Sequence, residues 1–234
     1  MAGTLYLIPV PLGPVDPATC LPPDTLAVAR RLDRFVVERA KTARAHLKAM
    51  GHPLPMQSIE MQELNEHTPA AAIADLLAPL RAGHDLGLLS EAGCPAVADP
   101  GANLVRAAHA AAIPVVPLVG PSSILLALMA SGLGGQRFAF HGYLPAKEPE
   151  RSLAIRELDK RARREQATQL FIETPYRSAA LLDTLANTLS PETSISVGAD
   201  LSLPGQLILT RSARDWRGQA DTLKDRLAVF GIGA

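Results

Sequence analysis

Three carboxylates stand where the sequence predicts strands to end. Glu38 closes one short apolar run, Glu91 comes just after a second, and Glu173 ends a third. The carboxyl ends of parallel strands share one edge of a sheet, where ligands bind, and a carboxylate there can act as a general base toward an alcohol. Each of the three has a second interpretation, in which it only accepts hydrogen bonds from backbone N–H groups of neighbouring loops. Both interpretations stay open.

The stretch at residues 86–101 predicts a ligand-binding loop. Residues 86–89 form an apolar run typical of a strand buried on both faces, and the Ser, Gly, Pro and Asp residues that follow cannot continue it. Asp99 and Pro100 then resemble a helix start, with Asp as the cap and Pro in the first turn. An ordinary strand-to-helix connection is the alternative, but such connections usually need about 2–6 residues and this one is longer.

Two further loops have unusual chemistry. Residues 9–14 contain three prolines and one glycine, which makes a stiff loop unlike the three-glycine turn of dinucleotide-binding folds. Residues 120–123 read GPSS, and Ser122 or Ser123 can cap a helix over residues 124–131. The hydroxyls and free N–H groups at that helix start predict a second ligand-binding edge.

Strand and helix patterns alternate along the first half, which predicts an α/β fold with a mostly parallel, doubly wound sheet over residues 1–116. Residues 117–234 predict a second α/β domain with a mixed sheet. In that domain residues 194–200 and 205–211 are near enough to pair antiparallel, and residues 227–230 predict a closing strand. The helices are expected at residues 24–32 with Asp24 and Thr25 at the start, 41–50, 69–82, 102–112, 147–166 and 178–189.

Composition removes several classes of protein. The 23 basic and 23 acidic residues balance, so no global positive field favours a polyanion. The cysteines Cys20 and Cys94 are too few for a disulfide framework, the histidines are scattered, and no metal site is expected. No apolar run nears the roughly 20 residues of a membrane span. Because the N-terminus runs straight into a strand pattern, we expect a cytoplasmic protein.

A charged helix at residues 147–166 is a local basic feature. It carries Arg151, Arg156, Lys160, Arg161, Arg163 and Arg164. Such a helix can contact RNA phosphates. It can equally be a solvated helix face, and the sequence does not separate these two interpretations.

Six motifs together resemble one known family. They are PVPLG at residues 9–13, SEAGCP at 90–95, ADPG at 98–101, GPSS at 120–123, SGL at 131–133 and FIETPYR at 171–177. In this order they resemble the tetrapyrrole methylase superfamily of S-adenosylmethionine-dependent methyltransferases, near the branch that methylates a cytidine ribose 2′-hydroxyl in small-subunit ribosomal RNA. Of the Ala-Glu-Asp-Thr-Arg run typical of that branch, only Glu38 is kept. The chain is most similar to shorter methyltransferases of the superfamily whose acceptor is not assigned.

The resemblance implies a two-domain enzyme, a homodimer, with S-adenosylmethionine held between the domains largely by backbone groups. The positions that match the family's cofactor-binding segments are Pro9, Pro11, Leu89, Ser90, Glu91, Ala92, Gly120, Pro121, Ser122, Ser123, Phe171, Ile172, Ala199, Asp200 and Leu201. Glu38, Glu91 and Glu173 are then the candidate catalytic carboxylates. Ribosomal RNA is one candidate acceptor. A small molecule or another macromolecule is an alternative, as is a non-catalytic module that binds the cofactor or RNA.

Overall fold

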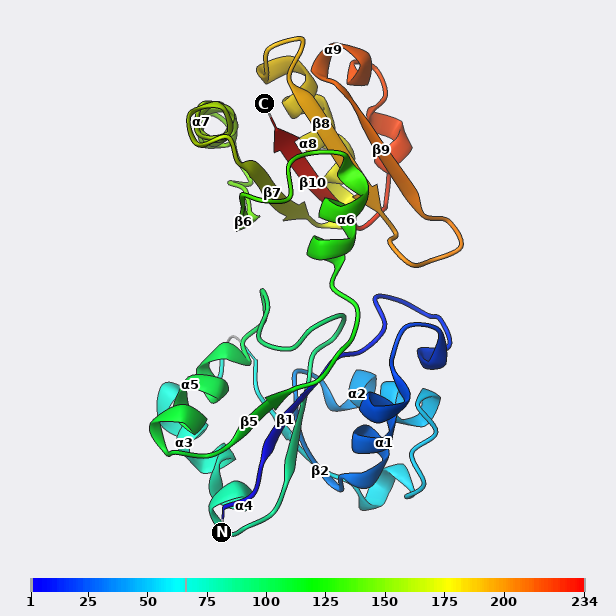
Figure 1. Ribbon diagram of the computed structural model, residues 1–234, viewed down its shortest axis with the longest axis vertical. Coiled ribbons are helices and arrows are strands. Elements are labelled where there is room, and N and C mark those ends of the chain that lie inside the picture. Colours follow the sequence, from blue (N-terminus) through cyan, green and yellow to red (C-terminus); the bar gives the residue numbers. More distant parts are fainter. Residues whose placement is uncertain (1, 66, 234) are drawn as a thin grey trace. The chain divides into compact units, whose positions relative to one another are not determined.

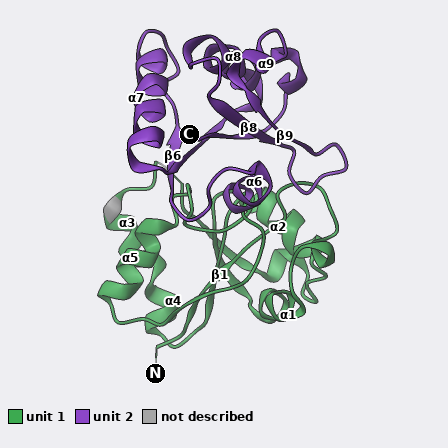
Figure 2. Cartoon of the chain, turned by 45° about the horizontal axis from the view of Figure 1, so that its top comes forward, with its two compact units in different colours: residues 1–122 green, residues 123–234 purple. Residues whose placement is uncertain are grey.

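The chain divides into two compact units, residues 1–122 and 123–234, in a computed structural model that describes residues 2–65 and 67–233 (Figure 2). The boundary expected after residue 116 falls inside strand β5 (Val115–Pro117). This strand pairs with β1 (Leu5–Ile8), so the chain stays in the first unit until it has passed the sheet.

The first unit is built on a five-stranded parallel sheet in the order β3-β2-β4-β1-β5. Its remaining strands are β2 (Arg34–Val37), β3 (Glu60–Glu63) and β4 (Leu86–Leu89), and all four residues of β4 are buried, as the apolar run predicts. In register, Val37 lies beside Leu89 and Leu89 lies beside Ile8. The loops that leave β2, β4 and β1 therefore start side by side at one edge.

Helices cover both faces of this sheet (Figure 1). On one face α1 (Pro23–Arg31) and α2 (Ala40–Ala49) pack on Phe35 and Val37; on the other, α3 (Ala70–Leu76), α4 (Ala78–Arg81) and α5 (Ala102–Ala110) pack on Val36. Side chains alternate between faces along a strand. A continuous apolar run such as residues 35–37 therefore supplies both cores. Two 3-10 turns, η1 (Pro17–Thr19) and η2 (Met56–Ser58), complete the unit.

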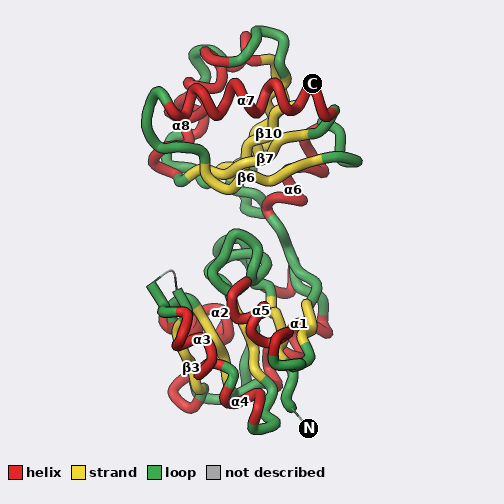
Figure 3. Tube along the Cα trace, turned by 90° about the vertical axis from the view of Figure 1, so that its left-hand side faces the viewer, coloured by secondary structure: helices red, strands yellow, loops and turns green. Residues whose placement is uncertain are grey.

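The second unit has a mixed sheet in the order β6-β7-β10-β8-β9. Its elements are β6 (Phe138–Tyr143), β7 (Thr168–Glu173), β8 (Ser194–Ala199), β9 (Leu207–Ser212), β10 (Ala228–Gly233), α6 (Ser123–Ser131), α7 (Glu150–Glu165), α8 (Pro175–Thr188), α9 (Ala213–Trp216) and η3 (Ala220–Leu223). The core gathers Trp216 and the stacked rings of Phe171 and Phe230. Figure 3 shows α7 running across the sheet beside β10 and β7, the two strands that it contacts.

The two-domain α/β fold with one parallel and one mixed sheet is confirmed, and β8 and β9 pair antiparallel as expected. The strand expected at residues 227–230 is present as β10 (Ala228–Gly233), and its place in the sheet is a further finding. β10 lies in the middle of the second sheet, antiparallel to both β7 and β8. A strand at the end of a sequence can fill a central slot, and local patterns do not show this.

Three local expectations are wrong. The helix expected at residues 69–82 is divided at Leu77 into α3 and α4. Helix α1 is preceded by Pro22 at the N-cap rather than by Asp24 or Thr25, and α5 has Gly101 rather than Asp99 at its N-cap. The Thr25 hydroxyl instead donates to the carbonyl of Val119 at 2.8 Å, which ties α1 to the loop after β5.

Candidate functional site

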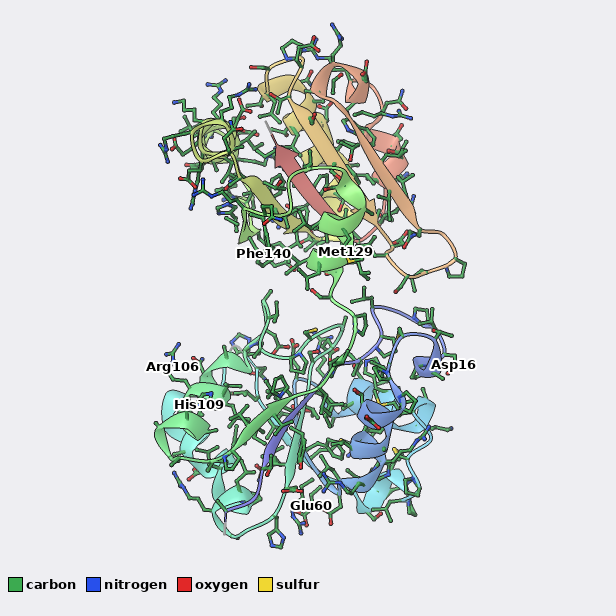
Figure 4. The ribbon with its side chains drawn as sticks, in the orientation of Figure 1. Asp16, Glu60, Arg106, His109, Met129 and Phe140 are labelled. Atoms are coloured by element: carbon green, nitrogen blue, oxygen red, sulfur yellow. The ribbon has the colours of Figure 1, made fainter. Side chains whose placement is uncertain are left out.

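The candidate site of the first unit lies at the carboxyl edge of its sheet. Figure 4 locates this edge: Asp16 lies in the loop that leaves β1, whereas Glu60, the first residue of β3, lies at the opposite edge. The loops at residues 9–14, 90–101 and 119–122 leave β1, β4 and β5 on this side. Since β4, β1 and β5 are consecutive in the sheet, the three loops that the sequence singled out are neighbours.

Backbone contacts join the first two loops. Val10 and Gly93 form an antiparallel bridge, in which the N–H of each residue donates to the carbonyl of the other, with N···O distances of 3.0 and 3.1 Å. Gly93 has φ of +72°, and a Cβ there would lie 3.1 Å from a methyl of Leu12. A side chain at this position would strain the backbone, so the glycine permits the close approach of the two loops.

The third loop packs on the other two. The Cys94 thiol donates to the carbonyl of Pro121 at 3.3 Å, and burial raises the pKa of this thiol. A Cβ on Gly120 would lie 2.3 Å from Cβ of Pro9, a distance that only a glycine allows. The structure therefore brings Pro9, Gly120 and Pro121 into direct contact with one another or with the residue 90–101 loop.

Side chains inside the residue 90–101 loop hold its own backbone. Ser90 is buried, and its hydroxyl lies 3.3 and 3.2 Å from the carbonyls of Ala92 and Gly93. Asp99 accepts from the N–H of Gly101 at 2.8 Å and of Ala96 at 3.4 Å. Ala96 and Ala98 have positive φ angles of 65° and 56°, and such strained residues gather at functional sites.

The charge of Asp99 is disfavoured in this loop. Burial raises the pKa of the Asp99 carboxyl, and the negative charge of Glu91 raises it further, while the N–H groups of Gly101 and Ala96 work in the opposite direction. The sequence interpretation of Asp99 as a helix cap missed this role. Its actual partners lie two residues ahead and three residues behind, within the loop.

A cavity of about 370 Å³ opens beside these loops. Its lining includes Pro11, Gly13, His46 and Glu91 and is mostly apolar. The N–H groups of Glu91 and Ala92 donate no hydrogen bond to another described residue. Peptide donors next to an apolar wall suit a ligand with both a polar backbone-binding part and a flat apolar part, so the residues present fit the cofactor that the sequence implies.

His46 is a site residue that the sequence interpretation missed. It lies on α2 with its Nε2 at 3.1 Å from the carbonyl oxygen of Glu91, and it lines the 370 Å³ cavity. A signal for it exists in the sequence: His46 is spaced three residues after Ala43 and four before Met50, both buried. A polar residue on the buried stripe of a helix points toward neighbouring elements.

Glu38, the first of the carboxylates, follows β2 directly and is half-buried. Because Val37 pairs with Leu89, Glu38 and Ser90 leave adjacent strands at the same edge. Glu91 is half-buried and lines the cavity through the same loop. The structure therefore brings two of the three candidate carboxylates to one edge of the first unit.

Glu173 belongs to the second unit and has a different environment. Its side chain is 1% exposed, and one carboxylate oxygen accepts from Arg177 Nη2 at 2.6 Å, Arg177 Nε at 2.9 Å and the N–H of Thr174 at 2.7 Å. These bonds hold the junction between β7 and α8. They favour the second interpretation of Glu173, in which it binds neighbouring donors.

The remaining candidates in the second unit meet at one end of β10. Ala228 pairs with Glu173 on one side and with Ala199 on the other, so the ends of β7 and β8 lie at the same edge. Most of their side chains are buried or paired within the second unit. Phe171 and Ala199 are fully buried, Leu201 is 6% exposed, and Asp200 forms an ion pair with Arg226 at 2.6 Å; Ile172 is half-buried.

Within residues 2–65 and 67–233, no group of three or more His, Cys, Asp or Glu residues is arranged to hold a metal ion. No helix in that part of the chain has the length and apolarity needed to cross a membrane.

Comparison with known proteins places this chain beside methyltransferases. Residues 4–215 match the model of the tetrapyrrole (corrin/porphyrin) methylases. A protein from Synechocystis sp. named ribosomal RNA small subunit methyltransferase I is 30% identical over 228 residues, which cover 97% of this chain and 74% of that protein. One of the same name from Mesorhizobium japonicum is 33% identical over 228 residues, with 96% and 74% covered.

Solved structures share the fold. The methyltransferase CobJ has a TM-score of 0.65 with 19% identity and covers 100% of this chain and 94% of its own. Uroporphyrin-III-C-methyltransferase from Thermus thermophilus has a TM-score of 0.57 with 22% identity, with 100% and 93% covered.

Proposed function

The chain belongs to the tetrapyrrole methylase family and is an S-adenosylmethionine-dependent methyltransferase, and from this premise we propose that its acceptor is a ribose 2′-hydroxyl of small-subunit ribosomal RNA. The main support for this acceptor is the similarity to relatives named ribosomal RNA small subunit methyltransferase I, at 30% and 33% identity over 228 residues. The retained Glu38 and the basic helix α7 support it.

The residues that would hold the methyl donor are the loop positions of the first unit and the strand ends of the second. In the first unit these are Pro9, Pro11, Leu89, Ser90, Glu91, Ala92, Gly120, Pro121 and Ser122; the chain continues into the second unit at Ser123. In the second unit they are Phe171, Ile172, Ala199, Asp200 and Leu201. Because the side chains of Ser90, Phe171, Ala199 and Asp200 have partners within their own units, we expect binding mainly through peptide groups.

When bound, the donor supplies an electrophilic methyl group on a sulfonium. The protein has to place the acceptor oxygen in line with that group, at about 3–3.5 Å, and such positioning accounts for much of the rate enhancement. Glu38 accepts the proton of the acceptor hydroxyl, since it stands at the edge where the loops meet and a general base typically contributes about 10²–10⁴-fold. Glu91 borders the cavity and is the second candidate for this role.

The cellular setting follows from the same proposal. With this acceptor we expect a cytoplasmic location, because the named relatives come from bacteria, whose ribosomes assemble in the cytoplasm. The resemblance to the family also implies a homodimer, which light scattering coupled to size-exclusion chromatography tests directly. A mass equal to one chain at micromolar concentration contradicts the dimer.

The acceptor is tested in two steps. Titration calorimetry with S-adenosylmethionine first measures binding of the donor. Radiolabelled donor is then offered with small ribosomal subunits from a strain that lacks the corresponding methyltransferase, and in parallel with a metabolite extract. Label in the RNA that resists alkaline cleavage next to the modified ribose supports the proposal. Label only in small molecules contradicts the RNA acceptor, and donor binding without any transfer indicates a non-catalytic module.

A further inference from the structure

A second surface, outside the loops described above, gathers positive charge in the second unit. It is a cavity of about 660 Å³ between edge strand β6 and the last turn of α7. Arg137, Phe138, Arg161, Arg164 and Glu165 line it. We call this cavity the basic groove.

One acidic residue, Glu165, holds the three arginines of the basic groove. Arg161 Nε lies 2.9 Å from one oxygen of Glu165, and Arg164 Nη2 lies 3.0 Å from the other. Arg137 Nη1 donates to the backbone carbonyl of Glu165 at 3.3 Å. The two neighbouring guanidinium groups lower the pKa of the Glu165 carboxyl, which therefore stays charged at neutral pH. Three like charges thus remain close together because a single acidic residue orients them.

The basic groove keeps an excess of donors and of charge. A guanidinium has five N–H donors, and each of the three arginines uses one of them in the bonds to Glu165. Among its described lining residues the three arginines face one carboxylate. The side chains of Arg161 and Arg164 are 41% and 66% exposed, so the remaining donors are accessible. Such a surface fits an anion with several oxygens, and guanidinium groups bind phosphate oxygens in pairs.

Size and apolar surface identify the kind of anion. A cavity of about 660 Å³ is in the range that holds a molecule much larger than one phosphate ion. Phe138 lines it and is 43% exposed, and an exposed ring beside cationic groups is a platform on which a nucleic-acid base can stack. Phosphate binding and stacking together are the features by which proteins hold a single strand.

We propose that the basic groove binds the sugar–phosphate backbone of a single-stranded segment of the RNA acceptor. This proposal rests on the function proposed above, because it names a contact to the same acceptor. It assigns a role to two of the arginines of α7, Arg161 and Arg164, and to Arg137 on the edge of the sheet. The other basic residues of the helix are left as a solvated face.

The test compares two double variants with equal charge. Arg161→Gln with Arg164→Gln removes two cations of the basic groove, and Arg156→Gln with Lys160→Gln removes two exposed cations of the same helix that do not line it. Binding of a fluorescein-labelled single-stranded RNA of about a dozen nucleotides is measured by anisotropy at several salt concentrations. Each lost phosphate contact lowers the slope of log K against log[salt] by about 0.7, so the first variant should lose about 1.4 in slope and roughly tenfold in affinity.

Two more measurements complete the test. Phe138→Leu keeps an apolar side chain but removes the ring, and it should weaken binding by about fivefold or more while leaving the salt slope unchanged. Inorganic pyrophosphate serves as competitor. Displacement of the RNA only at concentrations far above that of the RNA supports a strand, whereas equal affinity for pyrophosphate indicates a site for a free phosphate compound and overturns the proposal.

The outcomes separate this proposal from the acceptor proposal. Equal losses of RNA affinity in the two double variants would overturn the proposed groove, because they would reflect only the overall charge of the protein. Wild-type RNA affinity in the Arg161 and Arg164 variant would overturn it as well. If that variant also methylates ribosomal RNA at the wild-type rate with a wild-type KM, the groove is refuted while the acceptor stands. If the wild-type protein binds RNA through the groove but transfers no methyl group to it, the acceptor proposal fails and the groove remains.

Discussion

Gly93 offers the sharpest test of the idea that the loops of the first unit form one donor-binding surface. It has φ of +72°, it bridges Val10 through two hydrogen bonds, and a Cβ there would meet Leu12 at 3.1 Å and the Pro121 carbonyl at 3.4 Å. A residue with a Cβ pays about 1–2 kcal/mol in the left-handed region. Gly93→Ala therefore strains the point where three loops meet.

The strain can relax in the free protein but not in the complex, if binding needs the loop shape seen here. In that case the penalty of about 1–2 kcal/mol appears as weaker donor binding, and 1.4 kcal/mol corresponds to a factor of ten in Kd. We expect S-adenosylmethionine to bind Gly93→Ala about 5- to 30-fold more weakly in titration calorimetry. Thermal unfolding should move by only about 2–4 °C for each kcal/mol that remains in the free state.

Gly51 supplies the matched control. It ends α2 with φ of +76°, and a Cβ there would approach the Arg30 side chain no closer than 3.5 Å, an ordinary contact. Gly51→Ala thus imposes the same backbone penalty in the same unit, away from the loops. We expect a similar loss of stability and an unchanged Kd for the donor. Wild-type affinity in both variants would refute the role given to the residue 90–101 loop, and equal weakening in both would show that general destabilisation is the cause.

Three other changes probe the carboxylates. Glu38→Gln should lower kcat of methyl transfer by about 10²–10⁴-fold while leaving the Kd of the donor unchanged, and a wild-type kcat would remove Glu38 as the base. Glu173→Gln weakens the buried bonds to Arg177 and Thr174 and should lower the free energy of unfolding by about 1–3 kcal/mol in urea titrations; wild-type stability with a lost kcat would instead make Glu173 catalytic. Asp99 has a raised pKa in the folded protein, so its contribution to stability is present below the unfolded pKa of 3.8 and is lost as the pH rises through the folded value. Asp99→Asn should therefore be more stable than the wild type at pH 7, with the difference shrinking as the pH falls toward 4; a constant difference would contradict the effect of burial.

The parallel half of the fold could be predicted from the sequence because its signals are local. The buried run of β4, the glycine and proline residues after it and the alternation of strand and helix each depend on a few adjacent residues. Right-handed crossover connections then leave few ways to order such strands. The place of β10 between β7 and β8 could not be predicted, since its neighbours come from about 30 to 60 residues earlier and its own sequence is as apolar as that of an outer strand.

The same contrast applies to single site residues. The three loops were found from their composition, but the contacts that join them are between residues far apart in the chain, such as the Cys94 thiol with Pro121 and Gly120 with Pro9. Asp99 looks like a helix cap because Asp before Pro is common there, and the competing bonds to Ala96 and Gly101 depend on the loop's strained shape. His46 could have been found from its place on the buried stripe of α2.

In the proposed site, backbone and side chains have different roles. This difference explains why the methyl donor is easier to recognise from the sequence than the methyl acceptor. Within the residue 90–101 loop, Ser90, Cys94 and Asp99 all spend their polar groups on peptide groups of the loops themselves. These side chains set the shape of the loop, and the peptide N–H groups of Glu91 and Ala92 donate to no other described residue, which leaves them available to the donor in our proposal. A loop shape of this kind depends on the spacing of glycine, proline and small polar residues, and this spacing can be read directly from a sequence. The contacts that we propose for the acceptor depend instead on separate side chains, Glu38 in the first unit and the arginines of the basic groove in the second, which are far apart along the chain.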